Sequence, residues 1–193
     1  ADGTMTISGS GEMKEYYGSD DSPAYDNSKI KKVVIENGIT SIGAYAFSSC
    51  SNLTDITIPD SVTSIGEYAF QNCSSLTEIT IPSSVKSIGA NAFSDCTGLI
   101  SITIPKSVTS IGDDAFSGTS WLTNKQQDNP LVIVNGILID GTTCSGKVTI
   151  PDGVTSIGNF AFYNCTGLTS ITIPKSVTSI GTDAFYGCDD SLE

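Results

Sequence analysis

The chain has 193 residues, of which 38% are hydrophobic and only 16% are charged, so it can bury a core, but a thin one. Its 9 Lys and Arg against 21 Asp and Glu give a net charge of -12, which makes nucleic acid and anionic membranes poor partners, and no apolar run is long enough for membrane insertion. Because the chain has no histidine, the commonest general base and metal ligand, we expect no enzymatic activity, no cofactor and no metal site.

Residues 1–32 precede a repeated pattern and are interpreted as an N-terminal cap. Residues 5–8, Met-Thr-Ile-Ser, alternate apolar and polar side chains close to glycines, which predicts a short strand. Residues 14–28 are polar and rich in turn-forming types. A cap would cover the open edge of the first repeat. A separate binding domain is the alternative, but about 30 residues support little core of their own.

A repeat with a period of 23 residues begins at residue 33, and its template is Ile-x-Ile-Pro-x-x-Val-x-Ser-Ile-Gly-x-x-Ala-Phe-x-x-Cys-x-x-Leu. In the third copy Ile79 and Ile81 flank Thr80, which is the alternation of a half-buried strand. Pro82 ends this strand because it lacks an amide donor. The copies that follow the template begin at residues 33, 56, 79, 102, 148 and 171.

The second half of each repeat carries apolar residues at a spacing of three. In the third copy these are Phe93, Cys96 and Leu99, a spacing typical of one face of a helical or 3₁₀ turn. Gly89, between the two halves, predicts a bend or a close approach of two backbones. Each repeat is therefore expected to form a short strand, a corner, a second extended piece and a short helical turn.

One such coil cannot bury its own apolar side, but stacked coils bury identical positions against one another. We therefore expect an α/β fold over residues 33–193, a β-α superhelical solenoid with short parallel strands and short helical or 3₁₀ turns. The phenylalanines of the template are expected to form one buried spine. They are Phe47, Phe70, Phe93, Phe116, Phe162 and Phe185.

Residues 125–147 have the length of a fifth repeat but not its template. Two apolar runs surround Asn135-Gly136, and Asn-Gly is the strongest short signal for a hairpin turn. We predict a β-hairpin over residues 131–140, preceded by an exposed loop over residues 124–130. The hairpin is either a spacer that keeps the coils in register, which we favour, or a protrusion that docks a partner.

The strand-forming residues resemble the signature of leucine-rich repeats. Leu-x-x-Ile-x-Ile occurs at residues 53–58, 76–81, 99–104 and 168–173, and its continuation Ile-Pro-x-x-Val-x-x-Ile-Gly-x-x-Ala-Phe-x-x-Cys is similar to the BspA-like subclass of bacterial surface proteins. The resemblance covers about residues 33–188 except the fifth repeat. It implies a leucine-rich-repeat solenoid whose strand side is a binding surface. It also implies secretion or surface display, and adhesion to host proteins or other cells.

One surface is the candidate binding site. Threonines lie between the strand isoleucines, and mostly polar residues two positions earlier point to the same side. The preference of Thr for solvated strands can explain such a row, and a polar surface for a protein partner is the functional interpretation. We call these residues the strand face: Asp55, Thr57, Glu78, Thr80, Ser101, Thr103, Thr149, Ser170 and Thr172.

The cysteines are a second regular feature. Five of the six occupy one template position, and Cys144 lies outside it. The fourth repeat has Thr119 at that position, which favours a small buried side chain over a reactive one. Buried free thiols are the favoured interpretation, and disulfides between coils or metal ligation are the alternatives.

Together these patterns favour an interaction module over an enzyme. We expect a monomeric, secreted or surface-displayed chain, itself a piece of a longer protein, that binds an extracellular host or bacterial protein through its strand face. A carbohydrate-binding or cell-wall-binding module and a passive spacer are the alternatives. Exposed rows of aromatic residues would support carbohydrate binding, and Tyr45 and Tyr68 occupy one such repeated position.

Overall fold

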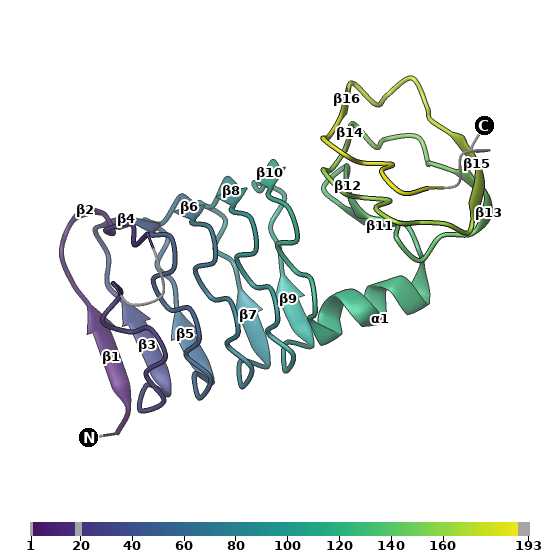
Figure 1. The fold of residues 1–193 in the computed structure, drawn as a ribbon. Helices are drawn as coiled ribbons and strands as arrows, with labels where there is room; N and C mark the ends of the chain where they lie inside the picture. The colour runs from purple at the N-terminus through teal and green to yellow at the C-terminus, as the bar shows by residue number, and fades with distance from the viewer. Residues whose placement is uncertain (1, 18–20, 189–193) are drawn as a thin grey trace. The chain divides into compact units, whose positions relative to one another are not determined.

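The computed structural model describes residues 2–17 and 21–188. The chain forms two compact parts, an N-terminal part (Ala1–Thr123) and a C-terminal part (Asn124–Glu193). Short strands and turns make up most of each part, and the described residues contain a single helix (Figure 1). Each part is a stack of coils around its own apolar core.

Parallel strands run along two sides of the N-terminal part (Figure 1). The strand side comprises β1 (Thr4–Ile7), β3 (Lys32–Ile35), β5 (Asp55–Thr57), β7 (Glu78–Thr80) and β9 (Ser101–Thr103). The short-strand side comprises β2 (Gly11–Glu12), β4 (Ile39–Ile42), β6 (Ser64–Ile65), β8 (Ser87–Ile88) and β10 (Ser110–Ile111). On the short-strand side each strand pairs with the next in the order β2-β4-β6-β8-β10, so successive coils lie directly on one another.

Identical template positions stack in the N-terminal part. Ser64 pairs with Ser87, and Ser87 pairs with Ser110. The hydroxyl of Thr63 donates to the carbonyl oxygen of Thr40, 23 residues earlier, at 3.0 Å. Each 23-residue repeat therefore forms one coil, and neighbouring coils are separated by the spacing of parallel strands, about 4.8 Å.

The helical or 3₁₀ turns expected around each Ala-Phe pair do not form within the described residues, and this stretch is a run of tight turns. Its amides alternate between two kinds of acceptor. The amide of Phe47 donates to Ala69 of the next coil, whereas the amide of Ser48 donates back to Tyr45. Tyr45 and Ser49 have φ values of 56° and 59°, and this left-handed backbone interrupts any helix.

Stacked phenylalanine rings fill the centre of the N-terminal part. The rings of Phe47, Phe70, Phe93 and Phe116 follow one another with centroid separations of 5.4, 5.3 and 5.8 Å and nearly parallel planes. Trp121 ends the stack, with its ring tilted by 58° at 4.9 Å from Phe116. The expected spine is therefore present in this part of the chain.

Helix α1 (Ser120–Asp128) replaces most of the exposed loop expected over residues 124–130. Thr119 explains where the helix begins, because its hydroxyl accepts a hydrogen bond from the amide of Leu122 at 3.1 Å and donates to the carbonyl of Phe116 at 2.7 Å. This is the geometry of a helix N-cap. Pro130 follows the helix and cannot continue it.

The C-terminal part also has two sets of strands. One comprises β11 (Val132–Val134), β12 (Ile137–Asp140), β14 (Ser156–Ile157) and β16 (Ser179–Ile180), and the other comprises β13 (Gly146–Thr149) and β15 (Leu168–Thr172). β11 and β12 form an antiparallel hairpin that turns at Asn135-Gly136. Paired residues in the regular coils are 23 positions apart in the sequence. Ile137 of the hairpin pairs with Ser156, which departs from this spacing, whereas Thr149 pairs with Thr172 and follows it.

The core of the C-terminal part has its own aromatic stack. Phe162 is fully buried and its ring stacks on Phe185 at 5.1 Å. Leu138, Ile157 and Leu168 pack in the same apolar cluster. The six phenylalanines therefore form two stacks, one in each part, because the hairpin repeat supplies no phenylalanine.

Candidate functional site

Exposed polar side chains line the strand side of the N-terminal part. In β7, Ile79 is buried in the core with 5% exposure, while its neighbours Glu78 and Thr80 are exposed. β5 and β9 repeat this arrangement with a partly buried isoleucine at the centre. Glu78 pairs with Ser101, and Thr80 with Thr103, so equivalent side chains form rows across the coils. The strand-face residues of this part are Asp55, Thr57, Glu78, Thr80, Ser101 and Thr103.

Charge is distributed unevenly on this surface. The Nζ atom of Lys32 lies 2.5 Å from a carboxylate oxygen of Asp55, and both side chains are about half exposed. Such an exposed pair stabilises the fold by only about 0–1 kcal/mol. It does neutralise the carboxylate of Asp55, whereas Glu78 on the next coil turns its carboxylate to solvent.

The remaining strand-face residues lie in the C-terminal part. Thr149 pairs with Thr172, and Lys147 pairs with Ser170. Thr149 and Thr172 are exposed, and Ser170 is half-buried. The structure therefore divides the residues expected to act together into two groups, one in each part.

The cysteine ladder is made of free thiols, and all of them are buried except Cys188, which is half-buried. The Sγ atom of Cys73 donates to the carbonyl oxygen of Phe47 at 3.2 Å, and that of Cys96 donates to Phe70 at 2.9 Å. Burial raises the pKa of the Cys50 thiol to about 12. Because the thiolate is the reactive form, these side chains are structural hydrogen-bond donors that tie each coil to the one before.

We expect the ladder thiols to resist alkylation in the folded chain. At a pH near 8.5 an ordinary thiol is about half ionised, but Cys50, whose pKa is about 12, stays protonated and is shielded from reagent. Cys188 is half-buried and should react first. Mass spectrometry after a timed pulse of iodoacetamide measures the order, and the denatured chain is the control. Labelling of Cys73 as fast as Cys188 in the folded state would contradict the burial of the ladder.

The tyrosine rows pack between coils. Tyr45 and Tyr68 stack with ring centroids 4.6 Å apart. Burial is the main cause that raises the pKa of the Tyr45 hydroxyl, and the neighbouring Tyr68 and Glu67 raise it further by charge repulsion. In the C-terminal part Tyr163 and Tyr186 stack at 5.5 Å and keep 40% and 61% of their surface exposed. The first row is mainly a packing feature, and the second also presents aromatic surface to solvent.

The repeats match a described family. Residues 21–135 and 141–193 match the BspA type leucine rich repeat region, in six copies. This chain belongs to the BspA-type leucine-rich repeat family. Its strands and turns, with little helix, form the β-solenoid of that family, and proteins of this fold are typically not catalytic.

This BspA-type chain is similar to solved bacterial leucine-rich repeat proteins, and spans less than two thirds of the first two. A protein from Bacteroides ovatus is 30% identical with a TM-score of 0.53, over 85% of this chain and 36% of that chain. One from Eubacterium ventriosum is 29% identical with a TM-score of 0.57, over 97% and 60%. The T. pallidum leucine rich repeat protein is 29% identical with a TM-score of 0.54, over 88% and 68%. No curated protein matches the chain.

The described residues of the BspA-type chain contain neither a membrane-spanning helix nor a cluster of metal ligands. Over residues 2–17 and 21–188, no helix has the length and apolar character needed to cross a bilayer. Within those same residues, no three His, Cys, Asp or Glu side chains lie close enough together to hold a metal ion.

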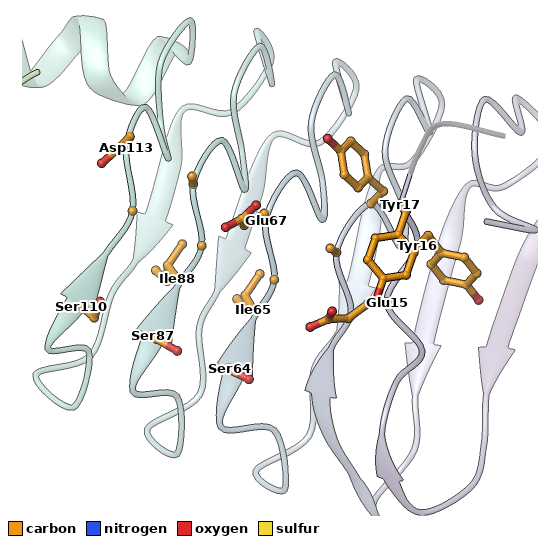
Figure 2. A pocket seen from close by; sticks show the side chains of 16 residues that line it. Glu15, Tyr16, Tyr17, Ser64, Ile65, Glu67, Ser87, Ile88, Ser110 and Asp113 are labelled. Carbon is orange, nitrogen blue, oxygen red and sulfur yellow. The ribbon is translucent and has the colours of Figure 1, made fainter. Parts of the chain in front are cut away.

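Sequence reasoning missed a groove on the short-strand side of the BspA-type repeats. It has a volume of about 760 Å³ and lies over β6, β8 and β10. Figure 2 shows Glu15 and Tyr17 at one end, Glu67 along its edge and Asp113 at the other end. The sequence does hold one signal for this groove, which is the acidic residue directly after the template glycine in two repeats, Glu67 and Asp113. The end wall, however, comes from the segment after β2, and no local pattern gives the position of that segment.

Proposed function

We propose that this chain is a protein-interaction module of a secreted or surface-displayed bacterial protein, and that it adheres to an extracellular host or bacterial protein through its strand face. The observation that carries this proposal is the set of exposed polar residues on β5, β7 and β9, which form rows between the paired strands β7 and β9. These rows stand on a stacked core, so a partner meets side chains whose backbone is already ordered. Binding to such a preorganised surface costs little conformational entropy, and solenoids commonly bind through extended surfaces of this kind.

The proposal gives the irregular segments supporting roles. β1 and β2 pair with β3 and β4, which supports residues 1–32 as an N-terminal cap on the repeats of residues 33–193. In the degenerate repeat of residues 125–147, β12 of the hairpin pairs in parallel with β14. Within the C-terminal part this pairing supports the hairpin over residues 131–140 as a spacer that takes the place of a coil, and not as a protrusion.

The double variant Glu78→Arg with Ser101→Arg tests the strand face. The two arginines would place bulk and positive charge at the centre of the polar rows, so binding to a protein captured by the wild-type chain should be lost. Extracellular host and bacterial proteins are captured on the immobilised chain, and the affinity of each captured protein is then measured by surface plasmon resonance.

A matched control is Asp60→Arg with Thr97→Arg. These residues are also exposed, lie outside the strand face, and change the net charge by the same amount. The control should bind as the wild type does. If the strand-face variant retains the affinity of the control for every captured protein, this surface is not the binding site.

Carbohydrate binding is the second candidate function. The observation in its favour is the exposed stack of Tyr163 and Tyr186 in the C-terminal part, because flat aromatic surfaces pack against sugar rings. A glycan array probed with the same chain separates the two functions. If the wild-type chain and the strand-face variant both bind the same glycan, that result would favour the tyrosine stack as the binding site.

A further inference from the structure

The groove on the short-strand side has a floor with little side-chain bulk. The glycine of each Ser-Ile-Gly lies against the backbone of the preceding coil, and a Cβ atom on Gly89 would stand 2.6 Å from the amide nitrogen of Glu67. Beside these glycines run serine hydroxyls, which can donate and accept hydrogen bonds with a polypeptide backbone. The serines that line the groove are Ser64, Ser87 and Ser110.

One end of the groove is closed by the segment that follows β2. The amide of Tyr16 donates to the carbonyl oxygen of Ala44 at 3.1 Å, which fixes this segment on the first coil. Glu15 and Tyr17 stand at the same end of the groove (Figure 2), and Tyr17 is 88% exposed. The ring of Tyr16 already has a cation near it, because Lys14 Nζ lies 5.3 Å from its centroid.

Acidic side chains continue along the groove at a regular spacing. Glu67 and Asp113 occupy the same template position in the second and fourth repeats, with Ala90 between them. Two coils of parallel strands correspond to about 9.6 Å. Among the described residues that line the groove there is no Lys or Arg, so the charges on its lining are all negative, and Lys14 lies beside the closed end near the ring of Tyr16.

We propose that this groove binds an extended cationic polypeptide segment whose Lys or Arg residues recur about every third position. In a polyproline II conformation three residues advance by about 9.3 Å, which matches the spacing of the two carboxylates. One cationic side chain would then pair with Glu67 and the next with Asp113, while the ring of Tyr17 offers a cation–π contact. This site is separate from the strand face and does not depend on its role.

Three synthetic peptides of one length test the proposal, and the first two have the same composition. The first peptide carries Lys at every third position, and the second carries the same lysines side by side. A third peptide replaces each Lys by Glu. In calorimetric titrations of the full chain, the first peptide should bind most tightly and the third should not bind. Binding should weaken when salt is raised from about 20 mM to about 200 mM, because the contacts are exposed ion pairs.

The double variant Glu67→Gln with Asp113→Asn should reduce the affinity for the first peptide about tenfold. The control variant, Glu36→Gln with Asp60→Asn, removes the same two charges at exposed positions outside the groove and should keep the wild-type affinity. Equal losses in both variants, or equal affinity for the two lysine peptides, would overturn the groove as a spaced cation site. Binding of spermidine as tightly as the first peptide would overturn a polypeptide as the occupant. Loss of the strand-face function leaves all of these outcomes unchanged.

Discussion

Replacing Phe93 by Ala is expected to lower the free energy of unfolding by about 3–5 kcal/mol. The Phe93 side chain has no exposed surface, and its ring is stacked between Phe70 at 5.3 Å and Phe116 at 5.8 Å. Removing the ring leaves a cavity with aromatic walls on two sides. The coils cannot close this cavity, because the backbone ladder fixes their separation.

Urea unfolding followed by circular dichroism measures the effect. Because the chain has two compact parts, the transition of the N-terminal part must be separated from that of the C-terminal part before a free energy is extracted. Phe185→Ala is the matched control. Phe185 is half-buried, and within residues 2–17 and 21–188 its ring stacks on that of Phe162 alone, so the same truncation should cost clearly less there. Equal costs at the two positions would show that stacking from both sides adds nothing.

The strands and their register could be read from the sequence because each template position has a local cause. Alternation around Thr80 gives the strand, Pro82 ends it, and the fixed period of 23 places identical residues on one another. The exposure of the strand-face residues follows from the same alternation. The turn type could not be obtained this way, because apolar residues three apart occur both in a helix and in a run of tight turns.

A signal for the turns was nevertheless present in the residues between the apolar ones. In several repeats the two positions with left-handed backbone, equivalent to Tyr45 and Ser49, are occupied by residue types that tolerate positive φ. At the first position these are Asn91 and Asp114, and at the second they are Asn72, Asp95 and Gly118. Aromatic residues hold the first position in three repeats, as Tyr45, Tyr68 and Phe160, and hide the pattern.

Two features that do not recur from coil to coil were beyond the repeat template. Helix α1 begins because Thr119 caps it, whereas the template explains Thr119 only as a small buried residue in place of a ladder cysteine. The groove depends on the segment after β2 lying on the first coil through the hydrogen bond from Tyr16 to Ala44. Neither arrangement recurs with the 23-residue period, so the repeat template predicts neither of them.

Substituting Gly89 by Ala should destabilise the N-terminal part by about 3 kcal/mol, the upper end of the usual cost of overpacking. An added Cβ atom would stand 2.6 Å from the amide nitrogen of Glu67 and 2.7 Å from the carbonyl carbon of Gly66. These are backbone atoms of the adjacent coil and cannot rotate away. Relief requires the two coils to move apart, which would stretch the 2.8 Å hydrogen bond from the amide of Gly89 to Ile65.

Gly158 provides a matched control at the same template position in the C-terminal part. Its amide makes the equivalent hydrogen bond to Leu138 at 2.8 Å, but a Cβ atom there would meet nothing closer than the carbonyl oxygen of Leu138 at 3.2 Å. Gly158→Ala should therefore change stability by no more than about 1 kcal/mol, since a tolerated alanine also lowers the entropy of the unfolded chain. Urea midpoints of the two variants decide the matter. A similar loss at both positions would mean that the glycine serves the local backbone conformation. A loss confined to Gly89→Ala would mean that glycine is needed where two template coils touch, and the hairpin repeat before Gly158 relaxes that contact.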